Sequence, residues 1–162
     1  MQEKLTEVWN FSKTTALAKH GDYYYFSHNT GLQNQFVYHR LTEKGSYKIN
    51  QKQPLEGSEV FLDPNTLSKD GTSSVGTKVW SPDGKYLAYQ IKVGGSDWAT
   101  IYLRDAETCK DLEDDVLKWV KFSDMSWTKD SKGFFYSRFE SPEVLKKDSM
   151  EGAGTETEKL KN

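Results

Sequence analysis

The sequence predicts an all-β fold: a partial β-propeller of about two to three blades of antiparallel strands, in which the ring is not closed. Two observations lead to this prediction. A tryptophan-led turn occurs at residues 80–85 and again at residues 127–132, and each copy runs into an aromatic strand. The spacing of 47 residues is typical of a propeller blade, and a chain of 162 residues is too short to close a ring of such blades. Tandem hairpins of a β-sandwich are the alternative.

Composition supports a β-rich domain and argues against several classes of function. Aromatic residues make up 14% of the chain, and broad side chains pack well on the pleated surface of a sheet. The net charge of −2, with both signs mixed, gives no reason to expect a nucleic-acid or membrane partner. The first residues contain no apolar run of the kind found in signal peptides, and Cys109 is the single cysteine. We therefore expect a cytoplasmic protein.

The chain before the first tryptophan-led turn is expected to form an incomplete first blade. Residues 1–20 are polar and weakly patterned, so they are interpreted as a lead-in segment, and the partial propeller is expected over residues 21–140. The third strand candidate of this blade ends at Asp63-Pro64, because proline cannot donate to a strand ladder. The three strand candidates are residues 23–26, 35–41 and 60–62.

The complete blade is expected near residues 76–118. Apolar and polar residues alternate along residues 87–93, which places Leu87, Tyr89 and Ile91 on one face. Residues 100–104 alternate again after a glycine-rich turn, so the strands near 86–93 and 99–105 are predicted to pair as a hairpin. Residues 111–120 are ambiguous, because Val116, Trp119 and Val120 have helical spacing but the helix would be short.

The second tryptophan-led turn begins a further blade. Its two strand candidates are residues 122–127 and 134–139. From residue 141 to residue 162 the chain is dominated by Lys, Asp, Glu, Gly and Thr, so this segment is expected to be a polar, flexible tail.

Several short motifs stand in the order found in the prolyl oligopeptidase (prolyl endopeptidase) family. The ordered set covers residues 5–157, and the chain resembles the first blades of that family's N-terminal β-propeller domain. The resemblance implies a cytosolic serine peptidase that cuts short peptides after proline, with a propeller that restricts access to an α/β-hydrolase domain. Besides the two tryptophan-led turns, the motifs are Asn29-Thr30-Gly31-Leu32-Gln33-Asn34-Gln35, Val60-Phe61-Leu62-Asp63-Pro64-Asn65, Gly95-Ser96-Asp97-Trp98, Val120-Lys121-Phe122-Ser123 and Gly154-Thr155-Glu156-Thr157.

The resemblance also implies roles for two residues. Phe122 matches an aromatic residue that reaches toward bound substrate near the domain interface. Asp97 matches a carboxylate that faces the peptidase domain and pairs with an arginine there. Considered from the sequence alone, Phe122 could equally be a core residue of its blade, and Asp97 could bind backbone amides of its own turn.

The chain itself contains no catalytic set. A serine hydrolase of this class needs Gly-x-Ser-x-Gly, then Asp, then His in chain order. No Gly-x-Ser-x-Gly occurs here, and Ser96, which follows two glycines, comes after all three histidines. The histidines and Cys109 also lack the spacing of a metal site, so neither a metal nor a cofactor is expected.

Two hypotheses of function follow. The first is a propeller fragment of a prolyl oligopeptidase-like peptidase that is inactive alone. Its partners would be the missing α/β-hydrolase domain and, in a full-length enzyme, short proline-containing peptides. The second is a free-standing propeller wedge that binds a protein or peptide through its open strand edges. The strings Gly-Leu-Gln-Asn-Gln and Gly-Ser-Asp-Trp argue against an acylaminoacyl-type or basic-residue-specific relative.

Overall fold

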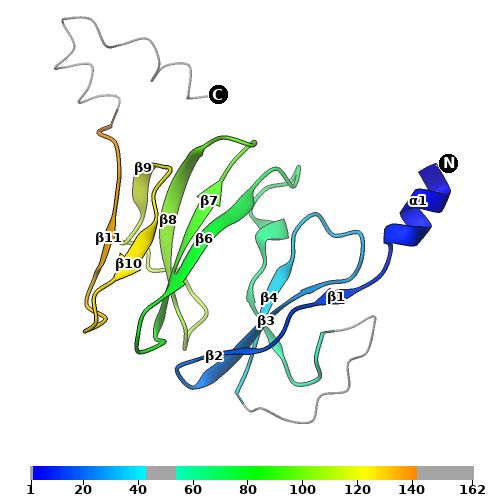
Figure 1. The fold of residues 1–162 in the computed structure, drawn as a ribbon, viewed down its shortest axis with the longest axis horizontal. Coiled ribbons are helices and arrows are strands. Elements are labelled where there is room, and N and C mark those ends of the chain that lie inside the picture. Colours follow the sequence, from blue (N-terminus) through cyan, green and yellow to red (C-terminus); the bar gives the residue numbers. More distant parts are fainter. Residues whose placement is uncertain (1, 43–53, 142–162) are drawn as a thin grey trace, which may run out of the picture.

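The computed structural model describes residues 2–42 and 54–141, which form three antiparallel sheets that follow one another along the chain (Figure 1). The sheets do not close into a ring within these residues, as predicted. In chain order the elements are α1 (Gln2–Trp9), β1 (Lys13–Thr14), β2 (Ala18–His20), β3 (Tyr23–Asn29), β4 (Val37–Leu41), β5 (Glu59–Leu62), the short 3₁₀ turn η1 (Pro64–Thr66), β6 (Ser74–Trp80), β7 (Tyr86–Lys92), β8 (Trp98–Asp105), β9 (Leu117–Lys121), β10 (Met125–Trp127) and β11 (Phe134–Tyr136).

The first sheet has more strands than the sequence indicated. β3, β4 and β5 pair in succession, as expected, but β1 and β2 also pair with β3, along its other edge. Residues 1–20 therefore contain helix α1 and two short strands in addition to loop. Strands of two and three residues are too short to show an alternating pattern, so neither could be predicted from the sequence.

The second sheet is a four-stranded meander in the order β6-β7-β8-β9. β7 and β8 pair antiparallel from Tyr86 opposite Asp105 to Lys92 opposite Ala99, which confirms the predicted hairpin. Both faces of β7 are buried. Leu87, Tyr89 and Ile91 pack toward the first sheet, and Ala88 packs toward the third. The predicted assignment of faces is thus also confirmed.

The helical alternative for residues 111–120 is wrong, because Leu117–Lys121 form strand β9. The pairing of β9 with β8 is irregular: Ala99 lies opposite Val120, but Ile101 lies opposite Leu117. Two residues of β9 thus face one of β8, which is a β-bulge. The backbone of Trp119 in this bulge has a φ of 64°, a left-handed conformation that is unusual for a large side chain.

The repeat that was recognised in the sequence is also a repeat in geometry. Ser81 Oγ donates to Asp83 Oδ1 at 2.7 Å in the first turn, and Thr128 Oγ1 donates to Asp130 Oδ1 at 2.6 Å in the second. Strand β10 of the third sheet lies beside β6 of the second. The Trp127 indole N–H donates to the carbonyl of Val79 in β6 at 3.0 Å. The two copies therefore occupy equivalent positions in neighbouring sheets.

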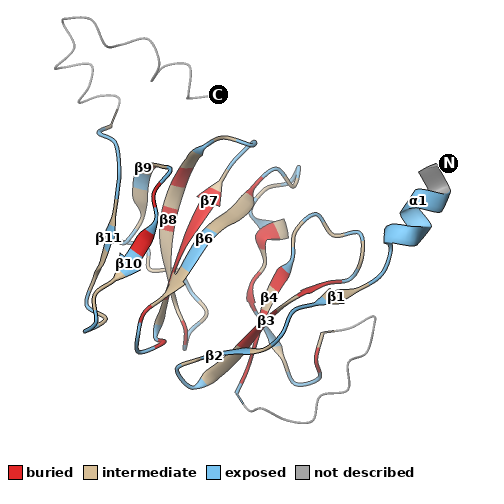
Figure 2. Ribbon diagram, in the orientation of Figure 1, coloured by how far each residue is buried: buried red, intermediate tan, exposed pale blue. Residues whose placement is uncertain are grey.

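The hydrophobic core lies between neighbouring sheets. Its buried residues are the red segments on the strands in Figure 2. The interface of the first and second sheets is aromatic: Trp80 lies 4.3 Å from Tyr25 and 5.6 Å from Phe61, measured between ring centroids. An arginine strengthens the same interface. Arg40 in β4 donates to the carbonyls of Ala106 and Glu107, across the gap between the sheets.

Two buried histidines lie side by side in the first sheet. His28 in β3 and His39 in β4 are 2% and 5% exposed, and their rings are 6.3 Å apart. His28 Nδ1 is 2.9 Å from Thr14 Oγ1, whereas His28 Nε2 and His39 Nδ1 have no hydrogen-bond partner. Burial lowers the pKa of both imidazoles below the ordinary value of 6.5, and His28 lowers that of His39 further.

The free energy of unfolding is therefore expected to fall as the pH is lowered from 7.5 to 5.5. The unfolded chain protonates these histidines near pH 6.5, whereas the folded chain resists protonation until a lower pH, so acid favours unfolding. Urea titrations at several pH values measure this slope. The double variant His28→Gln, His39→Gln should show a flatter slope, with the remainder due to His20, whose pKa burial also lowers. An unchanged slope in that variant would contradict the assignment.

Candidate functional site

Asp97 and Phe122, the two residues singled out in the sequence, lie close together at one end of the second sheet. Asp97 immediately precedes β8 and Phe122 immediately follows β9, and the two strands are antiparallel neighbours. The start of β8 and the end of β9 are at the upper end of the sheet in Figure 1. Strand pairing therefore brings together two side chains that are 25 residues apart in sequence.

Lys121 connects the two residues. It lies directly opposite Trp98 in the β8–β9 pairing. Its ammonium nitrogen is 3.9 Å from Asp97 Oδ2, 5.0 Å from the centre of the Phe122 ring and 5.6 Å from the centre of the Trp98 ring. Both ring distances are within the range of cation–π attraction. Lys121 was not among the site residues expected from the sequence.

Phe122 is not a core residue. Its side chain is 78% exposed, so the alternative that it packs inside its blade is wrong. Its backbone has a φ of 51°, which turns the chain out of the strand direction at this position. A left-handed conformation in a large residue costs roughly 1–3 kcal/mol and persists only where the surrounding structure enforces it.

The segment after Phe122 is held by buried polar groups. Gln90 in β7 is 4% exposed, and its side-chain amide donates to the carbonyl of Ser123 at 2.7 Å. Ser123 Oγ accepts a hydrogen bond from the backbone amide of Ser137, also at 2.7 Å. These contacts tie the turn to both the second sheet and the segment that follows β11, so the backbone that carries the exposed Phe122 ring is held in place.

Three further aromatic rings lie close to the turn that carries Phe122. Trp98 lies 6.3 Å from Trp119 and 5.4 Å from Phe139, both in edge-on arrangements. The backbone amide of Phe139 donates to the carbonyl of Trp119 at 2.8 Å. This hydrogen bond holds Phe139 beside the β-bulge. The Trp98 indole N–H is buried without a hydrogen-bond acceptor. We call Trp98, Trp119, Lys121, Phe122 and Phe139, together with Asp97, the aromatic patch.

Ser96 behaves as a turn residue. Its hydroxyl accepts a hydrogen bond from the backbone amide of Trp98 at 3.1 Å. The backbone amide of Trp98 is thus bound by the Ser96 hydroxyl, whereas the Asp97 carboxylate pairs with the Lys121 ammonium group. The histidines are elsewhere: His20, His28 and His39 belong to strands of the first sheet. Within residues 2–42 and 54–141, no three His, Cys, Asp or Glu side chains are grouped so that they could hold a metal ion.

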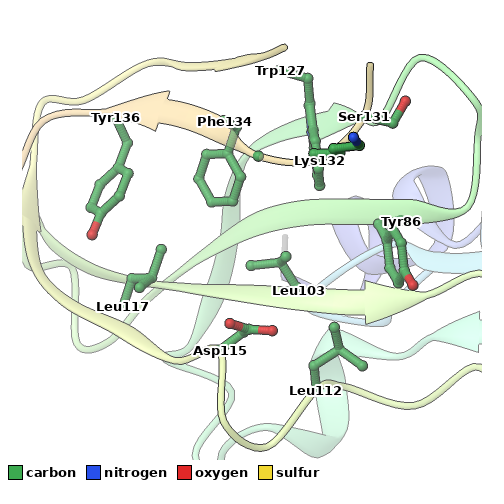
Figure 3. Close-up of a pocket in the computed structure, with 11 residues that line it drawn as sticks. Tyr86, Leu103, Leu112, Asp115, Leu117, Trp127, Ser131, Lys132, Phe134 and Tyr136 are labelled. Atoms are coloured by element: carbon green, nitrogen blue, oxygen red, sulfur yellow. The ribbon is translucent and has the colours of Figure 1, made fainter. Parts of the chain in front are cut away.

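A cavity of about 400 Å³ opens between the second and third sheets (Figure 3). Leu103 and Leu117 line it from the second sheet, and Trp127, Phe134 and Tyr136 line it from the third. The third sheet has two strands in the part of the chain that the structure describes, whereas the second has four. The cavity lies beside this narrower sheet, and Asp115, Ser131 and Lys132 are among its polar lining residues.

No helix among the described residues is long and apolar enough to cross a membrane.

Comparison with known proteins gives one consistent result. The family model described as the prolyl oligopeptidase N-terminal β-propeller domain matches residues 1–159. That match includes every residue of the aromatic patch.

Individual relatives agree with the family model. The chain is 42% identical over 142 residues to a prolyl endopeptidase of Elizabethkingia meningoseptica, which covers 88% of this chain and 18% of that protein. It is 38% identical over 157 residues to the dual function macrocyclase-peptidase POPB of Amanita bisporigera, covering 90% of this chain and 21% of that one. The chain thus spans about a fifth of the length of these relatives.

Solved structures show the same relationship. Prolyl oligopeptidase B of Galerina marginata, bound to a 35mer hydrolysis and macrocyclization substrate, aligns with a TM-score of 0.69 and 35% identity, over 86% of this chain and 21% of that chain. A prolyl endopeptidase structure from a study of inter-domain dynamics aligns with a TM-score of 0.71 and 25% identity, over 87% of this chain and 20% of that chain.

Proposed function

Because this chain belongs to the prolyl oligopeptidase family, as part of its N-terminal β-propeller domain, we propose that it serves a serine peptidase that cleaves short peptides after proline. The family model that matches residues 1–159 describes the propeller domain, and the chain spans about a fifth of the length of its relatives. Its contribution would be to restrict access to the active site and to present contacts to the peptidase domain and the peptide. The match over residues 1–159 is the observation that carries this proposal.

The aromatic patch supports two specific roles within this proposal. The Phe122 side chain is 78% exposed, and the Gln90 hydrogen bond to Ser123 holds the backbone next to it. The ring is therefore suited to contact a bound peptide. The Asp97 carboxylate is about half exposed, and its 3.9 Å contact with Lys121 leaves it able to accept a second cation. An arginine of the peptidase domain is the proposed partner, because a guanidinium group matches a carboxylate in two parallel hydrogen bonds.

The proposal includes the partners and the location. Short proline-containing peptides and an α/β-hydrolase domain are the proposed partners. A cytoplasmic location agrees with the single Cys109, which can form no internal disulfide.

Phe122→Ala, introduced into the native polypeptide that contains this chain, is expected to raise the KM for a fluorogenic Gly-Pro peptide by about tenfold, with a smaller change in kcat. Removing an exposed ring deletes a binding contact and leaves the reacting groups in place. Asp97→Asn should instead slow domain closure, which pre-steady-state kinetics separate from the chemical step. Equal kinetics for Phe122→Ala and the unchanged protein would contradict the peptide contact.

A free-standing binding module remains the second candidate, and one observation favours it. Strand β11 pairs with β10 on one side only among the described residues, and Phe135 in β11 is 73% exposed. An open edge of this kind can accept a strand from another chain. Reading the transcript beyond the codon for Asn162 distinguishes the candidates: a downstream Gly-x-Ser-x-Gly motif followed by Asp and His supports the peptidase, and a stop codon supports the module.

A further inference from the structure

We infer that Lys121 is a positioning residue that couples Asp97 to Phe122, so that the domain contact and the peptide contact of the proposed function depend on one ammonium group. The inference rests on the proposed function for its consequence, but the coupling itself is a property of this chain. Neither the sequence motifs nor the similarity to known proteins assigns a role to Lys121.

The position of Lys121 is set by the sheet. Lys121 is the last residue of β9 and is paired directly with Trp98, so backbone pairing fixes where its side chain begins. The side chain is 20% exposed, which is low for a lysine at the end of a strand. Most of the side chain is therefore covered, as in lysines that pack the aliphatic stem against neighbouring side chains.

The ammonium group has three partners. It lies near the faces of the Phe122 and Trp98 rings, at 5.0 and 5.6 Å, and near the Asp97 carboxylate at 3.9 Å. Because Phe122 is 78% exposed, packing does little to select one orientation of its ring. The attraction of the ring face to the Lys121 charge favours the orientation in which the ring lies over the ammonium group.

The contact with Asp97 is the loosest of the three ion pairs among the described residues. The other two, Arg40 with Glu59 and Arg104 with Asp111, have N–O distances of 2.7 and 2.9 Å, compared with 3.9 Å here. Asp97 can therefore turn toward an incoming cation while Lys121 stays on the rings. A cation that binds Asp97 repels or displaces the ammonium group and so acts on the Phe122 ring.

The test compares Lys121→Met, Lys121→Arg and Lys118→Met in the native polypeptide that contains this chain. Lys118 is an exposed lysine of the same strand and is the matched control. We expect Lys121→Met to raise the KM for a fluorogenic Gly-Pro peptide about two- to fivefold with little change in kcat. Lys121→Arg should restore the KM, because a guanidinium group keeps the charge over the rings, and Lys118→Met should have no effect.

The double variant Lys121→Met, Phe122→Ala distinguishes coupling from two separate effects. If Lys121 acts by orienting Phe122, its loss should add nothing to Phe122→Ala. Where Phe122→Ala raises the KM, a fully additive KM, an unchanged KM in Lys121→Met, or a Lys121→Arg variant as impaired as Lys121→Met would each overturn the inference.

A measurement on the 162-residue chain separates failure of this inference from failure of the proposed function. The ε-methylene protons of Lys121 should show ring-current shifts in NMR spectra that are reduced in Phe122→Ala and altered in Asp97→Asn. If Phe122→Ala leaves the KM unchanged, the peptide contact is wrong, and these shifts then decide the coupling. Shifts that do not respond to either substitution overturn it.

Discussion

The isolated 162-residue chain should hydrolyse a fluorogenic Gly-Pro substrate no faster than buffer does. Acyl transfer requires an activated nucleophile, a base and preorganised oxyanion donors. Removing the nucleophile or the base of a serine peptidase reduces kcat by about a millionfold. In this chain Ser96 binds the backbone amide of Trp98, and the histidines belong to strands of another sheet.

The assay should include the Elizabethkingia meningoseptica prolyl endopeptidase as a positive control and a covalent serine-directed probe. A contaminating peptidase is recognised because its activity is lost on repurification and is unaffected by Ser96→Ala. Labelling of Ser96 by the probe, or turnover that survives repurification and disappears in Ser96→Ala, would contradict the prediction.

The elements that could be predicted from the sequence are those with an undisturbed local pattern. Large apolar residues recur at every second position of β7 and β8, so their pairing and the face of β7 that carries Leu87, Tyr89 and Ile91 followed from period-2 spacing. The tryptophan-led turns could be matched because the side chain of Asp83 or Asp130 makes its hydrogen bonds within a few residues of itself. The same local hydrogen bonds form in both turns, although the turns belong to different sheets.

The elements that were missed depend on contacts between distant residues. Leu117 and Val120 face the same core cluster although they are three residues apart, because the bulge inserts one residue between them. Three-residue spacing resembles a helix, which explains the ambiguity at residues 111–120. Lys121 could not be identified for a related reason: its position opposite Trp98 depends on the register of β9, and the bulge sets that register.

Gly84→Ala is expected to destabilise the chain by about 3 kcal/mol or more, the largest effect of any single substitution proposed. Gly84 has a φ of +72°, and a Cβ atom at this position would lie 2.6 Å from the Cα of Gly21 and 2.7 Å from the carbonyl carbon of His20. These are backbone atoms of the β2–β3 turn, which cannot rotate away as a side chain can. The first and second sheets would have to separate at this point.

Gly95→Ala is the matched control, because Gly95 has the same φ of +72° but no atom within 4 Å of the added Cβ. It should cost only about 1 kcal/mol, the price of a left-handed alanine. The difference between the two urea midpoints measures the contact between the sheets. The second copy of the turn supports this reasoning: Ser131, which is equivalent to Gly84, has a φ of 59° and carries a side chain whose Oγ accepts from the amide of Asp83. A side chain is thus tolerated at this turn position where no neighbouring backbone crowds it, and equal losses in the two variants would show that conformational strain, not sheet packing, requires glycine at position 84.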